Sequence, residues 1–131
     1  MDPQFYDNID AQPCLNGKYK TLIQYFYANV QERGEHPFLG TRRNTGRHDA
    51  NDKPVFGEYE WLSFNQVKQL VDGLAKGIML RSLCPAIEAE GRRWHFLGIW
   101  AKNRWEWTVS LLAAMNYNVT VVGFYDAMSV D

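Results

Sequence analysis

Three stretches of the chain repeat apolar residues at the three- and four-residue spacing of an amphipathic helix. The first begins after Thr21, which forms a capping-box pair with Gln24, and we expect it to end at Gly34. Its apolar stripe consists of Leu22, Ile23, Phe26, Tyr27 and Val30. This stretch therefore predicts a first helix with one buried face.

The second stretch is the most regular one in the chain. Ser63 and Gln66 form another capping-box pair, and the helix must end before Pro85. The three-four spacing holds without a miss at Val67, Leu70, Val71, Leu74, Ala75 and Ile78. We expect this helix to be a packing element, so that Leu74→Ala would cost about 2–5 kcal/mol if the site is fully buried.

The third stretch follows Asn103, which forms the Asn version of the same reciprocal cap with Glu106. The helix carries apolar residues nearly all round, so we expect neighbouring elements to cover it on most sides. Residues 116–118, Asn-Tyr-Asn, are expected to end it.

Four shorter stretches predict strands. Residues 38–41 and the alternating residues 58–62 would pair as a hairpin, the second strand half-buried. Residues 96–101 and 119–125 are apolar or β-branched throughout, which is typical of strands buried on both faces. The polar residues 42–57, rich in Gly, Asn, Asp and Arg, predict a long mobile loop.

The resulting order of elements is helix, strand, strand, helix, strand, helix, strand. It predicts an α/β fold with a partial parallel or mixed sheet and flanking helices. Turn formers in residues 1–17 indicate an extended amino-terminal arm, which leaves 18–131 as one unit. A strand buried on both faces does not stand at a bare edge, so we expect an incomplete part of a larger fold. Alone, the chain should self-associate, stay loosely packed, or require the rest of its parent or a partner subunit.

Composition narrows the function classes. The 131 residues carry a formal net charge of −1, so nucleic-acid binding has no electrostatic support. The aromatic load is heavy, with 5 Trp, 7 Tyr and 7 Phe, and we assign most of it to a core or an interface. No apolar run approaches the roughly 20 residues that span a bilayer. The first residues lack the basic-then-apolar order of a secretory signal.

Metal and nucleophile chemistry finds little support. Cys14 and Cys84 are the only cysteines; one disulfide could join them, but two free thiols are the better expectation. His36, His48 and His95 are scattered without metal-ligand or catalytic spacing.

The best candidate ligand site follows a predicted parallel strand. Asn103, Arg104 and Glu106 lie where α/β sheets place ligands, and Arg104 could meet a phosphate. The cap spacing alone explains these residues, so we favour a structural role. Tyr125 and Asp126 also end a strand; Asp126 could orient a substrate, but Asp is an ordinary turn former there.

Three stretches resemble the long-chain fatty acid–CoA ligases of the adenylate-forming superfamily. Residues 59–67, YEWLSFNQV, are similar to the family's Y-x-W-L-S-Y-x-x-V segment between a strand and a helix. Residues 97–107, LGIWAKNRWEW, are similar to I-G-I-F-A-x-N-R-P-E-W, and residues 121–128, VVGFYDAM, to V-P-L-Y-D-T-L-G. A weaker match, FLGTR at residues 38–42, resembles L-G-x-R. Three matches in order point to the long-chain branch of the superfamily.

The matching motifs contain eight family-signature residues, for which the resemblance implies structural roles: Trp61, Ser63, Asn103, Arg104, Glu106, Trp107, Tyr125 and Asp126. Three departures stand beside them. Trp105 and Gly123 replace family prolines, and Met128-Ser129 replaces a Leu-Gly pair. These changes suggest a divergent member and leave open a paralogue without activity.

The resemblance implies an amino-terminal piece of the large adenylate-forming domain. The full-length family uses ATP, Mg²⁺ and CoA to convert a fatty acid through an acyl-adenylate into its thioester. The family's phosphate loop and its later motifs would lie beyond Asp131, so we assign no catalytic, cofactor-binding or metal residue to this segment. The chain alone is expected neither to hydrolyse ATP nor to form acyl-CoA.

Two other functions stay open. One is a non-catalytic, ligase-derived module that completes its fold against a partner subunit, and the other is a free-standing binding domain, which the uncovered last strand disfavours. By family resemblance we expect an intracellular protein, peripheral to an organelle membrane such as that of the endoplasmic reticulum, mitochondrion or peroxisome.

Overall fold

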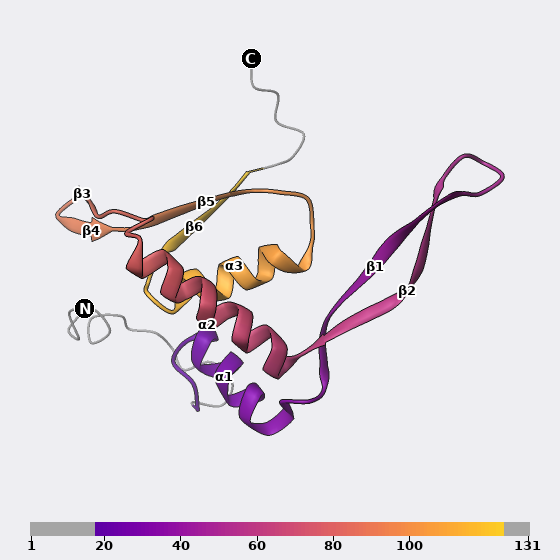
Figure 1. The fold of residues 1–131 in the computed structure, drawn as a ribbon. Helices are drawn as coiled ribbons and strands as arrows, with labels where there is room; N and C mark the ends of the chain where they lie inside the picture. The colour runs from indigo at the N-terminus through magenta and orange to yellow at the C-terminus, as the bar shows by residue number, and fades with distance from the viewer. Residues whose placement is uncertain (1–17, 125–131) are drawn as a thin grey trace, which may run out of the picture.

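The structure is a computed structural model, and it describes residues 18–124 (Figure 1). In these residues the elements are α1 (Leu22–Arg33), β1 (Pro37–His48), β2 (Pro54–Ser63), α2 (Phe64–Leu80), β3 (Ile87–Ala89), β4 (Arg92–Trp94), β5 (Phe96–Trp100), α3 (Trp105–Met115) and β6 (Thr120–Phe124). The strands form three two-stranded sheets, β1–β2, β3–β4 and β5–β6. The predicted mixed α/β fold is confirmed. The predicted arm and the candidates Tyr125 and Asp126 lie outside the described residues.

The helix α1 begins as its sequence predicts, with one change in the cap. Thr21 Oγ accepts from the backbone N–H of Gln24 at 3.3 Å, but the Gln24 side chain accepts from Lys20, one residue before the cap, at 2.9 Å. The buried stripe is narrower than predicted. Phe26 and Val30 are buried, whereas Leu22 at the first turn is 51% exposed.

Gly34 ends α1 for a reason that differs from the prediction. Its φ of −46° is right-handed, so the helix does not stop through a left-handed residue. A Cβ at this position would lie 2.6 Å from the Asn65 side chain, and Asn65 N–H donates to the Gly34 carbonyl at 2.9 Å. A side chain at residue 34 would therefore displace the Asn65 amide, which is bonded to Glu35.

The hairpin β1–β2 is much longer than predicted. The predicted pairing of residues 38–41 with 58–62 is confirmed by the register, in which Leu39 faces Leu62. The loop predicted for residues 42–57 is wrong, because β1 continues to His48, β2 begins at Pro54 and only residues 49–53 connect them. The hairpin extends away from the helices, so both of its faces meet solvent and polar side chains carry no burial cost (Figure 1).

Because both faces of the hairpin meet solvent, the prediction that its second strand is half-buried is wrong. Tyr59 and Trp61 are 58% and 53% exposed. The backbone ladder and local side-chain bonds hold this hairpin without a core of its own.

The helix α2 has the predicted capping box. Ser63 Oγ accepts from the N–H of Gln66 at 3.3 Å, and Gln66 Oε1 accepts from the N–H of Ser63 at 2.8 Å. The buried positions are Val67, Val71, Ala75 and Ile78. Leu74 is 37% exposed, so the cost stated above for a fully buried site does not apply to Leu74→Ala.

The strands β5 and β6 pair in parallel around α3, with Leu97 facing Val121, which confirms the predicted strand–helix–strand unit. The predicted burial of both faces is wrong for the described residues. One face packs on the core through Leu97 and Val121, and the outward face leaves four large side chains more than one-third exposed: Phe96, Trp100, Val122 and Phe124. No residue of α3 is exposed, as its all-round apolar pattern predicts.

The small hairpin β3–β4 was not predicted. Ala89 faces Arg92, so Glu90 and Gly91 form a two-residue turn, and both have positive φ, 53° and 69°. These angles are those of a type I′ hairpin turn, which favours Gly in its second position. The strands are only three residues long, too short for an alternation signal.

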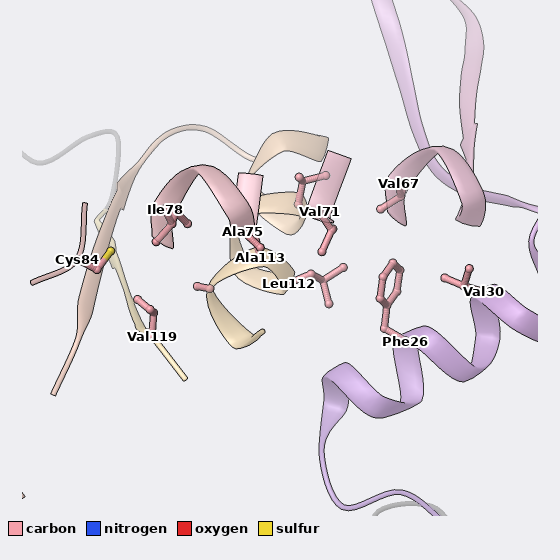
Figure 2. Close-up of a cluster of buried hydrophobic side chains, with 12 residues drawn as sticks. Phe26, Val30, Val67, Val71, Ala75, Ile78, Cys84, Leu112, Ala113 and Val119 are labelled. Carbon is pink, nitrogen blue, oxygen red and sulfur yellow. The ribbon is translucent and has the colours of Figure 1, made fainter. Parts of the chain in front are cut away.

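The core lies where the three helices and the β5–β6 pair meet (Figure 2). Its buried apolar members are Phe26, Val30, Val67, Val71, Ala75, Ile78, Cys84, Val109, Leu112, Ala113, Ala114 and Val119. An aromatic group closes the end next to the large hairpin. Phe38 and Phe64 stack with centroids 4.2 Å apart, and Phe26 lies 5.8 Å from Phe38.

Candidate functional site

The loop between β5 and α3 leaves the carboxyl end of a parallel strand, where the sequence placed its best candidates. Arg104, with φ −155°, occupies the N-cap position, and no side chain caps the helix there. The predicted cap by Asn103 is therefore wrong. The N-cap is the last residue with extended backbone before the helix, and Asn103 lies one position too early.

Arg104 and Glu106 form a two-pronged ion pair across the first turn of α3. Arg104 Nε donates to Glu106 Oε2 at 2.7 Å, and Nη2 donates to Oε1. The hydrogen bond from Arg104 lowers the pKa of Glu106, and the bond to Glu106 raises the pKa of Arg104. The Glu106 carboxylate also lies at the N-terminus of α3, where the helix dipole stabilises a negative charge. The Arg104 charge is balanced by Glu106 in the first turn of α3, which favours the structural interpretation.

Trp61 and Ser63 lie at the junction of β2 and α2, a different part of the fold. Ser63 caps α2, and the Trp61 ring covers Gly40 on β1, where an added Cβ would come within 2.8 Å of the ring. Within the described residues, no hydrogen bond or ion pair joins these two residues to Arg104 and Glu106. Trp107 packs toward β6, with Cζ2 3.5 Å from the position of a Cβ on Gly123. The signature residues thus support two separate junctions of the fold.

A polar cluster that the sequence pattern does not reveal joins all three helices. The Tyr27 hydroxyl of α1 lies 2.7 Å from Asp72 Oδ1 of α2 and 3.0 Å from Asn116 Oδ1 after α3, and it can donate its one proton to either. Lys68 Nζ donates to Asp72 Oδ2 at 2.5 Å. Tyr27 lies 45 residues from Asp72 and 89 from Asn116, so local periodicity gives no signal for this contact.

The cluster shifts two pKa values. Burial, and then the hydrogen bond to Asp72, raise the pKa of Tyr27 to about 12. Partial burial alone would raise the pKa of Asp72, but hydrogen bonds from Lys68 and Tyr27 outweigh it and lower that pKa. The cluster pairs the neutral Tyr27 phenol with the charged Asp72 carboxylate, which fits a structural contact between α1 and α2.

Tyr27→Phe should lower the free energy of unfolding by about 1–2 kcal/mol, since a hydrogen bond to a partly exposed carboxylate is lost. The folded pKa of about 12 lies above the ordinary value of about 10, so this contribution is complete below pH 10 and disappears towards pH 12. Urea unfolding of both proteins should therefore show a difference at pH 8 that narrows at pH values above about 10. An equal difference in unfolding free energy at pH 8 and at pH values above about 10 would contradict the Tyr27–Asp72 bond.

Among residues 18–124, the remaining reactive groups do not form a catalytic pair. His95 Nδ1 lies 2.7 Å from the backbone oxygen of Cys84, so the ring contacts the peptide and not the thiol. Burial raises the pKa of the Cys84 thiol, which lowers the fraction of nucleophilic thiolate. In residues 18–124 no group of three His, Cys, Asp or Glu side chains is arranged to hold a metal ion.

An open pocket of about 700 Å³ lies where the large hairpin meets α2. Its lining is Glu35, Pro37, Trp61, Ser63, Asn65, Gln66, Lys68 and Gln69. Glu35 Oε1 accepts from Asn65 Nδ2 at 2.6 Å, which ties the start of β1 to the start of α2. The sequence gives no signal for this pocket because its walls come from two stretches that are distant in sequence, residues 35–37 and 61–69.

Comparisons with known proteins agree with the sequence motifs. No family model matches the chain. Long-chain-fatty-acid–CoA ligase 1 of Cavia porcellus is 28% identical over 127 residues, 97% of this chain and 14% of the ligase. Human long-chain-fatty-acid–CoA ligase 6 is 30% identical over 83% of this chain and 13% of its own length. Fatty acyl-CoA synthetase B of Dictyostelium discoideum is 26% identical over 85% of this chain and 14% of its own length.

A solved structure shows the same fold. The A-PCP didomain of carboxylic acid reductase from Segniliparus rugosus, in complex with AMP, matches 87% of this chain and 16% of that chain with a TM-score of 0.63 at 16% sequence identity. This likeness concerns the fold alone. The described elements correspond to part of an adenylation domain, and the chain spans about one-seventh of the length of the curated relatives. The chain is therefore a relative of the long-chain fatty acid–CoA ligases, with the fold of one portion of an adenylate-forming domain.

Proposed function

We propose that this chain is the amino-terminal portion of an ATP-dependent, AMP-forming long-chain fatty acid–CoA ligase and is not catalytically competent alone. The observation that carries the proposal is the similarity across 97% of the chain to 14% of a ligase. In the full-length protein, ATP with Mg²⁺ would activate a fatty acid as acyl-adenylate, and CoA would displace AMP. Transfer of this kind needs cations and backbone donors around a polyphosphate.

In this proposal the segment has a structural role and forms part of the scaffold of the larger domain. The charge of Arg104 is balanced by Glu106, and that of Lys68 by Asp72, so both pairs stabilise helix positions. The β5–α3–β6 unit supplies a parallel strand pair onto which further strands can add. The nucleotide, acyl and CoA sites are assigned to the rest of the ligase.

The proposal is tested by the size of the native polypeptide that carries this sequence. An antibody against the 15.2 kDa chain should detect a protein about seven times longer, because the chain covers 14% of the relative. Detection of a 15.2 kDa protein, with no larger form, would favour the alternative of a non-catalytic module that completes its fold against a partner.

The outward face of β5–β6 predicts how the isolated chain behaves. Phe96, Trp100, Val122 and Phe124 are 40–58% exposed on one sheet face, which is a contiguous apolar surface. We expect the purified chain to self-associate in sedimentation as its concentration rises. A single monomeric species across the concentration series, with strong amide protection along β6, would contradict this expectation.

A further inference from the structure

One face of the β1–β2 hairpin carries aromatic rings and an arginine in a row. Facing residues of antiparallel strands share a face, so Arg42 lies on the same side as Tyr59, and Gly40 on the same side as Trp61. The Arg42 guanidinium lies 5.9 Å from the Phe56 ring centre and 5.7 Å from that of Tyr59. Tyr59 stacks on Trp61 with centroids 5.4 Å apart. We call these four residues, Phe56, Arg42, Tyr59 and Trp61, the aromatic face.

The aromatic face is held in place before any ligand arrives. Arg42 Nε donates to the Gly57 carbonyl at 2.7 Å, and Nη2 donates to the Phe56 carbonyl at 3.0 Å. Trp61 lies flat over Gly40, whose missing side chain makes room for the ring. Rings that are fixed and yet about half exposed can bind a partner with little further loss of conformational entropy.

Two polar groups on this face make no hydrogen bond within the described residues. The indole N–H of Trp94 donates to the Ala89 carbonyl at 3.2 Å, whereas within residues 18–124 the indole N–H of Trp61 and the hydroxyl of Tyr59 have no hydrogen-bond partner. Trp, Tyr and Arg are the residue types that dominate binding energy at protein interfaces. The aromatic face combines all three.

Charge is separated between the two faces of the hairpin. Glu60 follows Tyr59 in sequence and so points to the opposite face, where it pairs with Arg43 at 2.8 Å. The aromatic face keeps the cation of Arg42 and continues past Trp61 into the pocket at the base of the hairpin. The pocket has one carboxylate, Glu35, which is already bonded to Asn65. This separation favours a ligand with negative charge.

We propose that the aromatic face and the adjoining pocket bind an extended, proline-containing segment of a polypeptide that carries acidic side chains. Proline-rich segments form a preorganised left-handed helix with three residues per turn, and they dock on rows of aromatic rings. The free N–H of Trp61 can donate to a ligand carbonyl, and Arg42 can meet an acidic side chain. This binding role goes beyond the proposed ligase origin and does not depend on it.

Two other occupants fit the observations less well. Binding to a lipid surface would require apolar residues at the hairpin tip, but the turn at residues 49–53 is polar and includes Asp49 and Asp52. Single-stranded nucleic acid stacks on such rings, but it needs a basic groove, and the chain has a net charge of −1.

The test is a titration of the isotope-labelled 131-residue chain, kept at a concentration at which sedimentation shows a monomer, with a synthetic oligoproline that has Glu at every third position. We expect the indole N–H resonance of Trp61 and the amides of β2 to shift, and that of Trp100 on the outward face of β5 to stay. Trp61→Ala should weaken binding by about tenfold or more. Trp100→Ala is the matched control, because Trp100 is 58% exposed and lies on a different surface; it should bind as the wild type does.

A second variant tests the proposal independently, in case Trp61→Ala does not fold. Gln69 lines the pocket on the exposed side of α2, so Gln69→Glu leaves the core intact and adds a negative charge beside the ligand. It should weaken binding of the Glu peptide a few-fold and strengthen binding of the same peptide with Lys in place of Glu. The proposal is overturned if millimolar Glu peptide leaves Trp61 unperturbed, or if both peptides bind equally. Response of Trp61 to anionic vesicles or oligothymidylate, without response to the peptide, would also overturn it.

Discussion

Phe26→Ala is expected to lower the free energy of unfolding by about 3–5 kcal/mol, the range for a large aromatic side chain removed from a packed core. Phe26 is 5% exposed and joins α1 to the rings of Phe38 and Phe64, whose centroids lie 5.8 and 6.5 Å away. The loss would leave a cavity where α1, the hairpin base and α2 meet (Figure 2). Helix α1 contributes few other buried side chains, so its attachment should fail first.

Leu22→Ala is the matched control for this substitution. Leu22 lies one helical turn before Phe26 and is 51% exposed, so its truncation should cost less than about 1 kcal/mol. Urea unfolding followed by circular dichroism measures both variants. Equal costs for the two would show that the apolar face of α1 is not the one described above.

Val71→Asp should have the second large effect, a loss of about 4 kcal/mol or more at neutral pH. Val71 is fully buried on α2 within the apolar core, so a carboxylate there would lose its hydration. Typical domains are stable by only about 5–15 kcal/mol, so we expect this variant to be largely unfolded. The damage should lessen as pH falls towards 4, because a buried carboxyl with a raised pKa takes up a proton.

Leu74→Asp adds the same charge three residues further along the same helix. Leu74 is 37% exposed, so the carboxylate can reach water and the variant should stay folded. Thermal unfolding at pH 7 and at pH 4 compares the pair. If Val71→Asp were as stable as Leu74→Asp at pH 7, the position of the core along α2 would be wrong.

Local signals in the sequence were sufficient for the helices. The capping box of Ser63 placed the start of α2 to within one residue, and the spacing of Val67, Val71, Ala75 and Ile78 gave its buried face, because cap and stripe are set by neighbours three and four residues apart. The cap of α3 was misplaced by one position, since Asn103 is as good a capping type as any and the backbone alone decides which residue is last extended.

The strands show what periodicity cannot detect. Residues 42–48 and 54–57 form strands that bury neither face, so their side chains carry no alternation, and a polar run looks like a loop. The error for β5 and β6 has the opposite origin. Their continuous apolar runs predict burial on both faces, while the described residues cover one. In the full-length ligase that we propose, further chain would cover the other.

The candidate site was predictable only where its residues adjoin in sequence. Arg104 and Glu106 lie two positions apart, so a bond within this motif can be anticipated, although the predicted partner of Glu106 was Asn103. The Tyr27–Asp72–Asn116 cluster and the pocket beside Trp61 depend on how three helices and a hairpin pack. Such contacts between distant residues follow from tertiary structure and leave no local pattern.

We propose that the chain is a portion of a fatty acid–CoA ligase without catalytic competence of its own. The most direct test is fatty-acid-dependent release of pyrophosphate from ATP, measured side by side on the isolated 131-residue chain and on the longer native polypeptide isolated with an antibody to it. We predict release above background, with formation of acyl-CoA, from the longer polypeptide only. Release by the isolated chain, or a longer polypeptide that is inactive with every long-chain fatty acid supplied, would contradict the claim.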